Sequence, residues 1–146
     1  MASNLFDLRE LDALDKDLLK LANSSMPRES KKFIRSEGTK LKRVVVKRAK
    51  SDVGKDTGNY IKGIKKGKVY KYRGNDAWSI RVYGSAPHTH LIEYGHRMIG
   101  HKPNKKECGF VQGKHVFENS AKDFESTYVN DVGKFVDQVI VGGLKK

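Results

Sequence analysis

Leucines recur at helical spacing at the start of the chain. From Leu5 to Leu21 they fall three or four residues apart, which predicts one apolar stripe on a helix over residues 4–22. Pro27 is expected to end the helical region that begins here. We expect the stripe to pack on the protein's own core; the alternative is that residues 1–27 form an interaction arm for a neighbouring subunit.

Two further segments have the apolar spacing of long helices. The first covers residues 28–50, where flanking Lys and Arg residues favour helix, although Val44–Val46 alone would also suit a strand. Gly38 near its centre weakens this helix by about 1 kcal/mol relative to alanine. The second covers residues 116–141 over roughly seven turns and precedes a stop signal of two glycines at 142–143.

Between these helices the pattern changes to the alternation of strands. Residues 68–73 and 77–83 alternate on either side of a turn, which predicts an antiparallel hairpin. A short helical turn leading into a strand is expected over residues 59–64, and another strand at 91–94. Residues 97–109 are rich in His, Lys, Pro and Gly, and they predict a flexible loop or the tip of a β-arm.

Together these elements predict a single α+β domain over residues 1–146. It should contain a mainly antiparallel sheet of about four strands packed against the helices at 28–50 and 116–141, with the N-terminal amphipathic helix added. Glycine-containing connections are expected at 52–59, as a loop, and at 65–67, as a turn.

The positive charge of the chain is confined to one third of its length. The formal net charge is +13, and residues 28–75 hold 17 Lys and Arg against 4 Asp and Glu, whereas the remainder holds 13 of each. Such a segment attracts polyanions without specific contacts, and it would equally pair with an acidic protein surface. The candidate basic interaction surface consists of Lys62, Lys65, Lys66, Lys68, Lys71 and Arg73.

Other bulk features narrow the class of protein. Cys108 is the single cysteine, so an internal disulfide is excluded, as is typical of a reducing compartment such as a bacterial cytoplasm. The N-terminus leads into an acidic amphipathic segment, and we expect no signal peptide. No apolar run reaches the roughly 20 residues of a membrane span, so we expect no membrane association.

Histidines and one glutamate are the main candidates for catalysis. His88 and His90 lie two residues apart, and with His96 or His101 they would offer three nitrogen ligands, but this spacing matches no established zinc signature. Glu93 lies among apolar neighbours and is the best candidate for a general base. No second carboxylate accompanies it as in metal-dependent nucleases. We expect no catalysis, no metal and no cofactor; the alternative is a basic nucleic-acid-binding module or a metal-dependent nuclease.

Three short motifs occur in a distinctive order. They are Thr57–Tyr60 (TGNY) before the first strand, Ile92–His96 (IEYGH) at a strand end, and His115–Phe117 (HVF) leading through Ala121 into the last helix. Their order over residues 28–141 resembles the tail-component proteins of long-tailed bacteriophages. These are neck or tail-completion proteins, named after the tenth gene product of a lambdoid coliphage.

The resemblance implies a structural and non-enzymatic role. It implies a subunit of a ring, with a hexamer expected, at the head-proximal end of the tail or where head meets tail. The implied partners are further copies, the tail-tube protein and head-completion or connector proteins, with non-specific contact to DNA in the channel. The implied location is the virion, after assembly in the host cytoplasm. Asp56 and His115–Val116 stand where the family often has proline, which leaves the subfamily open.

Two sets of residues follow as candidates for assembly. Glu93, Tyr94 and Gly95 are expected to end a core strand, where the glycine permits a turn and the glutamate forms a salt bridge or binds loop amides. The loop at 97–109 is then expected to be held in the direction of a neighbouring subunit or ring, which it contacts during assembly. Its positively charged or titratable candidates are Arg97, His101, Lys102, Lys105 and Lys106.

Overall fold

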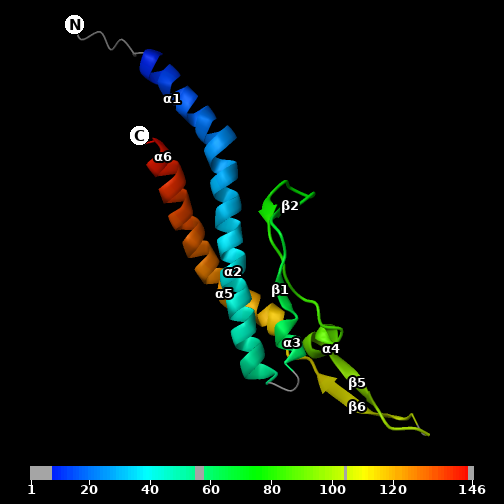
Figure 1. Cartoon of the computed structure of the whole chain (residues 1–146). Coiled ribbons are helices and arrows are strands. Elements are labelled where there is room, and N and C mark those ends of the chain that lie inside the picture. Colours follow the sequence, from blue (N-terminus) through cyan, green and yellow to red (C-terminus); the bar gives the residue numbers. More distant parts are fainter. Residues whose placement is uncertain (1–7, 55–57, 104, 145–146) are drawn as a thin grey trace.

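Two helical stretches and two β-hairpins make up the described part of the chain (Figure 1). The structure is a computed structural model, and it describes residues 8–54, 58–103 and 105–144. It confirms the α+β class. The single sheet of about four strands is wrong, because the described strands form three separate antiparallel pairs. Residues 4–7 of the predicted first helix and Thr57 of the TGNY motif lie outside the described residues.

The first helical stretch runs without a break through three elements. These are α1 (Leu8–Lys20), the π-helical turn η1 (Leu21–Ser25) and α2 (Met26–Asp52). The predicted break is wrong, because the helix continues through Pro27. The π-helical turn directly before it, in which the Met26 N–H donates to the Leu21 carbonyl, widens the helix where the proline N–H is missing. The predicted second helix is confirmed, and Val44–Val46 belong to it.

The second helical stretch returns antiparallel beside the first (Figure 1). It consists of α5 (Val116–Val136), the π-helical turn η2 (Asp137–Val141) and α6 (Gly142–Leu144). The long C-terminal helix is confirmed, but its glycine stop signal is wrong, since both glycines are helical. A β-carbon at Gly143 would lie 3.0 Å from the Leu21 side chain. The small residue therefore permits the two stretches to approach closely here.

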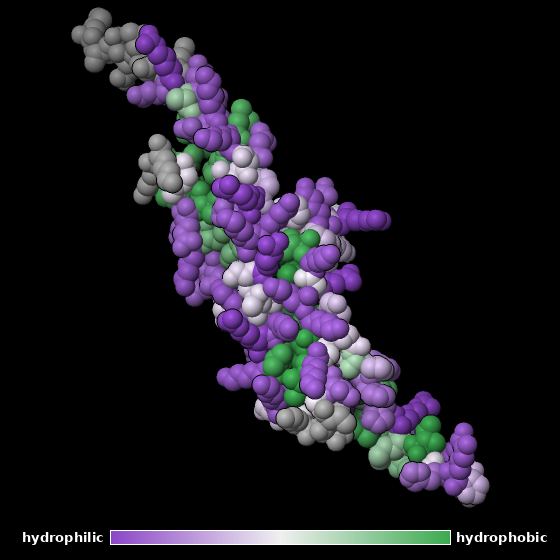
Figure 2. Space-filling model, viewed as in Figure 1, coloured by the Kyte–Doolittle hydropathy of each residue, from purple (hydrophilic) through white to green (hydrophobic). Residues whose placement is uncertain are grey.

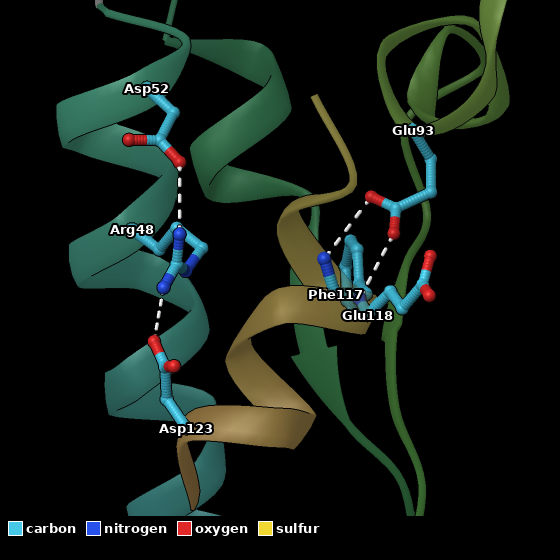
Figure 3. Close-up of polar contacts among 6 residues, drawn as sticks. All are labelled: Arg48, Asp52, Glu93, Phe117, Glu118 and Asp123. Carbon is cyan, nitrogen blue, oxygen red and sulfur yellow. Dashed lines mark hydrogen bonds and ion pairs between the residues drawn. The ribbon is translucent and has the colours of Figure 1, made fainter. Parts of the chain in front are cut away.

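Aromatic and ionic contacts hold α2 against α5. The ring of Phe33 stacks on that of Phe135 with centroids 4.6 Å apart. Near the other end of α2, Arg48 lies 3.4 Å from Asp52 and also donates a hydrogen bond to Asp123 of α5 (Figure 3). These contacts fix how the two long helices lie against each other.

The leucine stripe of α1 does not pack on the protein's own core as expected. Leu11, Leu14 and Leu18 are 45%, 44% and 41% exposed. The reason is that α1 extends beyond the end of its antiparallel neighbour, so little of the chain covers it (Figure 1). None of the helices in the described ranges is both long and apolar enough to cross a membrane.

The first hairpin is interrupted and lies beside α2. After α3 (Asn59–Lys62), which confirms the predicted helical turn, come β1 (Ile64–Lys66), β2 (Tyr70–Lys71), β3 (Trp78–Ser79) and β4 (Val82–Gly84). β1 pairs with β4, and β2 pairs with β3, both antiparallel. The predicted hairpin is thus confirmed in its topology, but its strands are shorter. The turn predicted after α3 is wrong, because its two lysines lie in β1.

The second hairpin projects away from the helices (Figure 1). It follows α4 (Thr89–Tyr94) and consists of β5 (Gly95–Ile99) and β6 (Glu107–Gln112). The strand predicted in place of α4 is wrong, since so short an apolar run does not distinguish helix from strand. The loop predicted at 97–109 lies within this hairpin and includes much of both strands. Residues 95–112 are called the β-arm below.

The packed centre is small for a chain of this length. Among the described residues the buried hydrophobic side chains are Val45, Ala49, Ile64, Val116 and Phe124. The accessible surface is 11549 Å², whereas a compact monomer of 16.5 kDa exposes roughly 7,600 Å². Figure 2 shows the narrow, elongated outline behind this difference, with apolar surface at several places along it.

Candidate functional site

Glu93 joins the end of α4 to the first turn of α5 (Figure 3). Its side chain is buried, its Oε2 accepts the N–H of Phe117 at 3.1 Å, and its Oε1 accepts the N–H of Glu118 at 3.1 Å. The first amides of a helix have no partner within the helix, and a carboxylate is favoured beside them. The side chain of His115, at the N-cap position, does not cap the helix amides. Glu93 therefore caps α5 from another element.

The backbone of the same junction sets where the β-arm begins. The His115 N–H donates to the Glu93 carbonyl at 3.1 Å. Gly95 has a φ of 82°, and a β-carbon there would overlap the Val111 carbonyl oxygen. Tyr94, in contrast, is 70% exposed. The structure thus places this trio at the end of a helix and not of a strand, and the amides that Glu93 binds belong to α5 and not to a loop.

Tyr60 of α3 shares the surroundings of Glu93. Burial, followed by the negative charge of Glu93, raises the pKa of Tyr60 to about 12. Its hydroxyl has no hydrogen-bond partner among the described residues. The phenol is therefore neutral at physiological pH, and its titration reports on the charge at the α4–α5 junction.

The geometry around Glu93 is that of a helix cap, which is relevant to its alternative role as the general base of a nuclease. Both carboxylate oxygens accept backbone amides, an arrangement that favours capping over proton transfer. His88 and His90 are exposed, whereas His96 lies in β5. Within the described ranges, no group of three or more His, Cys, Asp or Glu side chains is placed to hold a metal ion.

The predicted basic surface is spread along the first hairpin. Lys62 ends α3 at the base, and Arg73 follows β2 near the tip. Lys65 and Lys68 are exposed between them, and Lys71 lies over the Trp78 ring with its Nζ 5.1 Å from the centroid. These side chains form a row and not a compact patch.

Helix α2 adds a second basic row beside the first. Lys66 of β1 donates to Thr39 Oγ1 of α2 at 2.7 Å, so the two rows meet there. The sequence signal for the second row is the spacing of its basic residues within the predicted helix at 28–50. Its basic members around a shallow depression are Lys42, Arg43, Lys47 and Lys50.

The predicted assembly residues occupy the β-arm. Arg97 of β5 lies with its Nε 3.7 Å from Oε1 of Glu107 on β6. The other members are exposed at or next to the connection between the two strands. They are His101, Lys102, Lys105 and Lys106.

The β-arm also presents exposed apolar side chains, which are not among the charged or titratable candidates predicted from the sequence. Arg97 is directly opposite Phe110 in the strand register, and Ile99 lies two residues further along β5. Alternation therefore puts these three on one face of the β-arm, with Met98 on the other. Ile99 and Phe110 are 65% and 53% exposed. This face of the arm thus carries two apolar side chains together with Arg97 and with Glu107, which lies opposite Ile99 in the register.

An apolar groove of about 540 Å³ lies between α2, α5 and the first hairpin. Ile80 packs on Gly38 of α2, where a β-carbon would come within 2.7 Å of the Ile80 side chain. The sequence does not reveal this α2–α5 groove, because its residues come from three separate segments. Its main apolar and aromatic lining consists of Ile34, Leu41, Trp78, Ile80, Phe124 and Tyr128.

Glu37 lines the α2–α5 groove and is only 4% exposed. Its Oε1 accepts a hydrogen bond from Lys40 Nζ at 2.8 Å, but its Oε2 has no partner among the described residues. Lys40 also donates to Asp131 at 2.6 Å, which lowers the pKa of the Asp131 carboxyl. A buried carboxylate oxygen is costly without a donor. The groove therefore offers one unfilled acceptor beside an apolar surface.

Comparison with known proteins adds no family to these observations. No family model, curated protein or solved structure matches the chain. The resemblance to phage tail-component proteins therefore stays a prediction, and the function is argued from the residues and their geometry.

Proposed function

We propose that this protein is a structural subunit that completes the tail, or joins head to tail, in a long-tailed bacteriophage. It assembles as a ring, with a hexamer expected, and has no catalytic activity and no cofactor. Its partners are further copies, the tail-tube protein and head-completion or connector proteins. It resides in the neck or tail of the virion after assembly in the host cytoplasm.

The excess surface of the isolated chain is the observation that carries this proposal. The accessible surface of 11549 Å² is about 1.5 times the area expected of a compact monomer. The excess of roughly 4,000 Å² is larger than the roughly 1,600 Å² that a subunit buries in two standard interfaces. Each subunit of a ring has two such interfaces, made by different patches. A chain with this much exposed surface is better suited to an oligomer than to a monomer.

The distribution of exposed apolar side chains agrees with assembly. They occur on α1, at Leu14 and Leu19, and on the β-arm, at Ile99 and Phe110. Solitary apolar residues are normal on a surface, but groups of them on projecting elements are typical of interaction sites. The order of the phage-like motifs supports the choice of a tail or neck assembly over other assemblies.

The proposal is tested in the phage or prophage that encodes the protein. Deletion of the gene should yield heads and tails that fail to join, or tails of abnormal length, as seen by electron microscopy. A wild-type copy supplied from a plasmid should restore infectious particles, and a frame-shifted copy should not. Normal infectious particles from the deletion would contradict the proposal.

The two basic rows favour a second candidate, which is non-specific binding of nucleic acid. Phosphate attraction would suffice for this, and in a ring the same rows would line the DNA channel. Replacing Lys42 and Lys47 by glutamine should weaken DNA binding and lower its salt dependence by about 0.9 per lost phosphate contact. The nuclease version predicts divalent-dependent cleavage that Glu93→Gln abolishes. Equal background cleavage by both proteins would contradict it.

A further inference from the structure

We propose that the α2–α5 groove of one copy receives the β-arm of a neighbouring copy. Ile99 and Phe110 fill the groove, and Arg97 exchanges its exposed contact with Glu107, at 3.7 Å in the isolated chain, for the unpartnered oxygen of Glu37. The inference rests on the self-assembly proposed above and adds which surfaces meet. Because the two surfaces lie on different parts of the chain, the contact can repeat head to tail from copy to copy, as a closed ring requires.

The groove has the properties of a site that lacks its occupant. It is lined by aromatic side chains that still have exposed surface to cover, such as the half-buried Trp78 and Tyr128, which is 36% exposed. Glu37 adds a buried carboxylate oxygen with no donor among the described residues. An occupant that fits is therefore mostly apolar and carries a hydrogen-bond donor for this oxygen, which an arginine provides.

The β-arm has this combination on one face. Arg97, Ile99 and Phe110 lie together there by strand register. The arm as a whole has four Lys or Arg residues and one acidic residue, so its charge complements Glu37 and Glu125 in the groove lining. The lining also contains Lys122, but its Nζ is held by Glu118 at 2.9 Å. The hydrophobicity of the two surfaces thus matches. The match of charge is local to Glu37 and Glu125, because Lys31 and Lys71 lie over the Trp78 ring with their Nζ atoms 4.5 Å and 5.1 Å from its centroid.

The arm that fills the groove must come from another copy. The β-arm extends away from the paired helices, so it does not fold back on the groove of its own chain (Figure 1). The start of α1 at Leu8 is also remote from the groove, since the helical path from Leu8 to Ile34 is roughly 39 Å long.

Helix α1 of another copy is a poorer occupant on electrostatic grounds. Its leucines would suit the apolar lining, but its other faces carry Glu10, Asp12, Asp15 and Asp17. These carboxylates would approach the unpaired oxygen of Glu37 and add repulsion. The β-arm provides a donor, Arg97, for the unpaired oxygen of Glu37, whereas these carboxylates of α1 provide none.

The first test measures assembly of the full-length protein by sedimentation velocity over a range of concentrations. Ile99→Asp should raise the concentration needed for half-assembly by at least about tenfold, as for an interface anchor. Met98→Asp is the matched control, because it places the same charge on the opposite face of the same strand, and it should assemble like the wild type. Equal effects of the two variants would overturn the inference.

The second test uses Cys108, which is exposed on the β-arm. Glu125→Cys places a thiol in the groove lining, so mild oxidation should give disulfide-linked ladders on a non-reducing gel. Asn130→Cys, also exposed on α5 but outside the lining, should give no more ladder than the wild type. Combining Glu125→Cys with Cys108→Ser should abolish the ladder. Such bonds require α-carbons within about 7 Å, so they report on docking directly.

The outcomes separate this inference from the proposed function. Rings that form normally with Ile99→Asp and give no ladder with Glu125→Cys would overturn the docking and leave the ring proposal standing. Assembly lost with Leu14→Asp but not with Ile99→Asp would identify α1 as the occupant and also overturn it. Cross-linked chains that do not close into rings would support the docking and contradict the ring. Protein that stays monomeric without any ladder would overturn both.

Discussion

The carboxylate of Glu93 accepts the backbone N–H of Phe117 at 3.1 Å and so connects α4 to α5 across 24 positions of the chain. This bond spans the place where the β-arm leaves the body, because Gly95 begins β5 directly after α4. The same carboxylate also binds the N–H of Glu118. One buried side chain thus caps the long C-terminal helix and holds the base of the arm.

Removal of this carboxylate should destabilise the fold. Glu93→Ala leaves the two amides at the start of α5 without this acceptor, and we expect it to lower the free energy of unfolding by about 1–3 kcal/mol. Urea denaturation measures the change. Glu107→Ala is the control, since Glu107 is exposed and its loss should matter by less than about 0.5 kcal/mol. Equal unfolding midpoints for the two variants would contradict the capping role.

Two glycines in long helices should respond to alanine in opposite directions. Gly133→Ala in α5 meets no atom within 4 Å, so it should stabilise the protein by up to about 1 kcal/mol. Gly38→Ala in α2 places its β-carbon within 2.7 Å of Ile80. Overpacking of about 1–3 kcal/mol should cancel or exceed the helical gain. Thermal unfolding of both variants checks the prediction, which fails if both are stabilised equally.

Alkaline pH should weaken the fold through Tyr60. Its pKa in the folded protein is about 12, against an ordinary value of 10.0, so the unfolded chain loses this proton first. The stabilisation by the neutral phenol is therefore complete below pH 10 and is lost as the pH rises towards 12. Tyrosinate absorbance should show one late-titrating group that disappears in Tyr60→Phe. Tyr72→Phe is the control, since Tyr72 is 51% exposed.

Glu93 should shift this titration. Its negative charge contributes to the raised pKa of Tyr60, after burial. Glu93→Gln removes that charge and should therefore lower the pKa of Tyr60, while Glu107→Gln on the exposed β-arm should not change it. A late titration unaffected by Glu93→Gln would mean that burial alone sets this pKa.

The leucines of α1 should matter for assembly and not for the stability of a single chain. Leu14 is 44% exposed, whereas Val45 is 1% exposed in the packed centre. Leu14→Gln should therefore change the free energy of unfolding of the isolated chain by less than about 0.5 kcal/mol. Val45→Ala should lower it by about 2 kcal/mol, because it leaves a cavity. Denaturation at a concentration where the protein is monomeric distinguishes the two.

Helical periodicity alone was sufficient to locate the long helices, because a buried stripe repeats over many turns. It failed at short-range signals that tertiary contacts override. Pro27 does not break the helix, since the π-helical turn before it widens the helix where the proline N–H is missing. The four residues before Gly95 form a helix end in place of a strand, since a run this short carries no decisive period.

The sequence by itself determined the α+β class, the long helices, the first hairpin and the confinement of positive charge to residues 28–75. Only the tertiary structure decided what Glu93 binds and that Glu37, Trp78 and Phe124 meet in one groove. The physical reason is distance along the chain. Periodicity reports which face of an element is apolar, but it does not report which distant element covers that face or leaves it open.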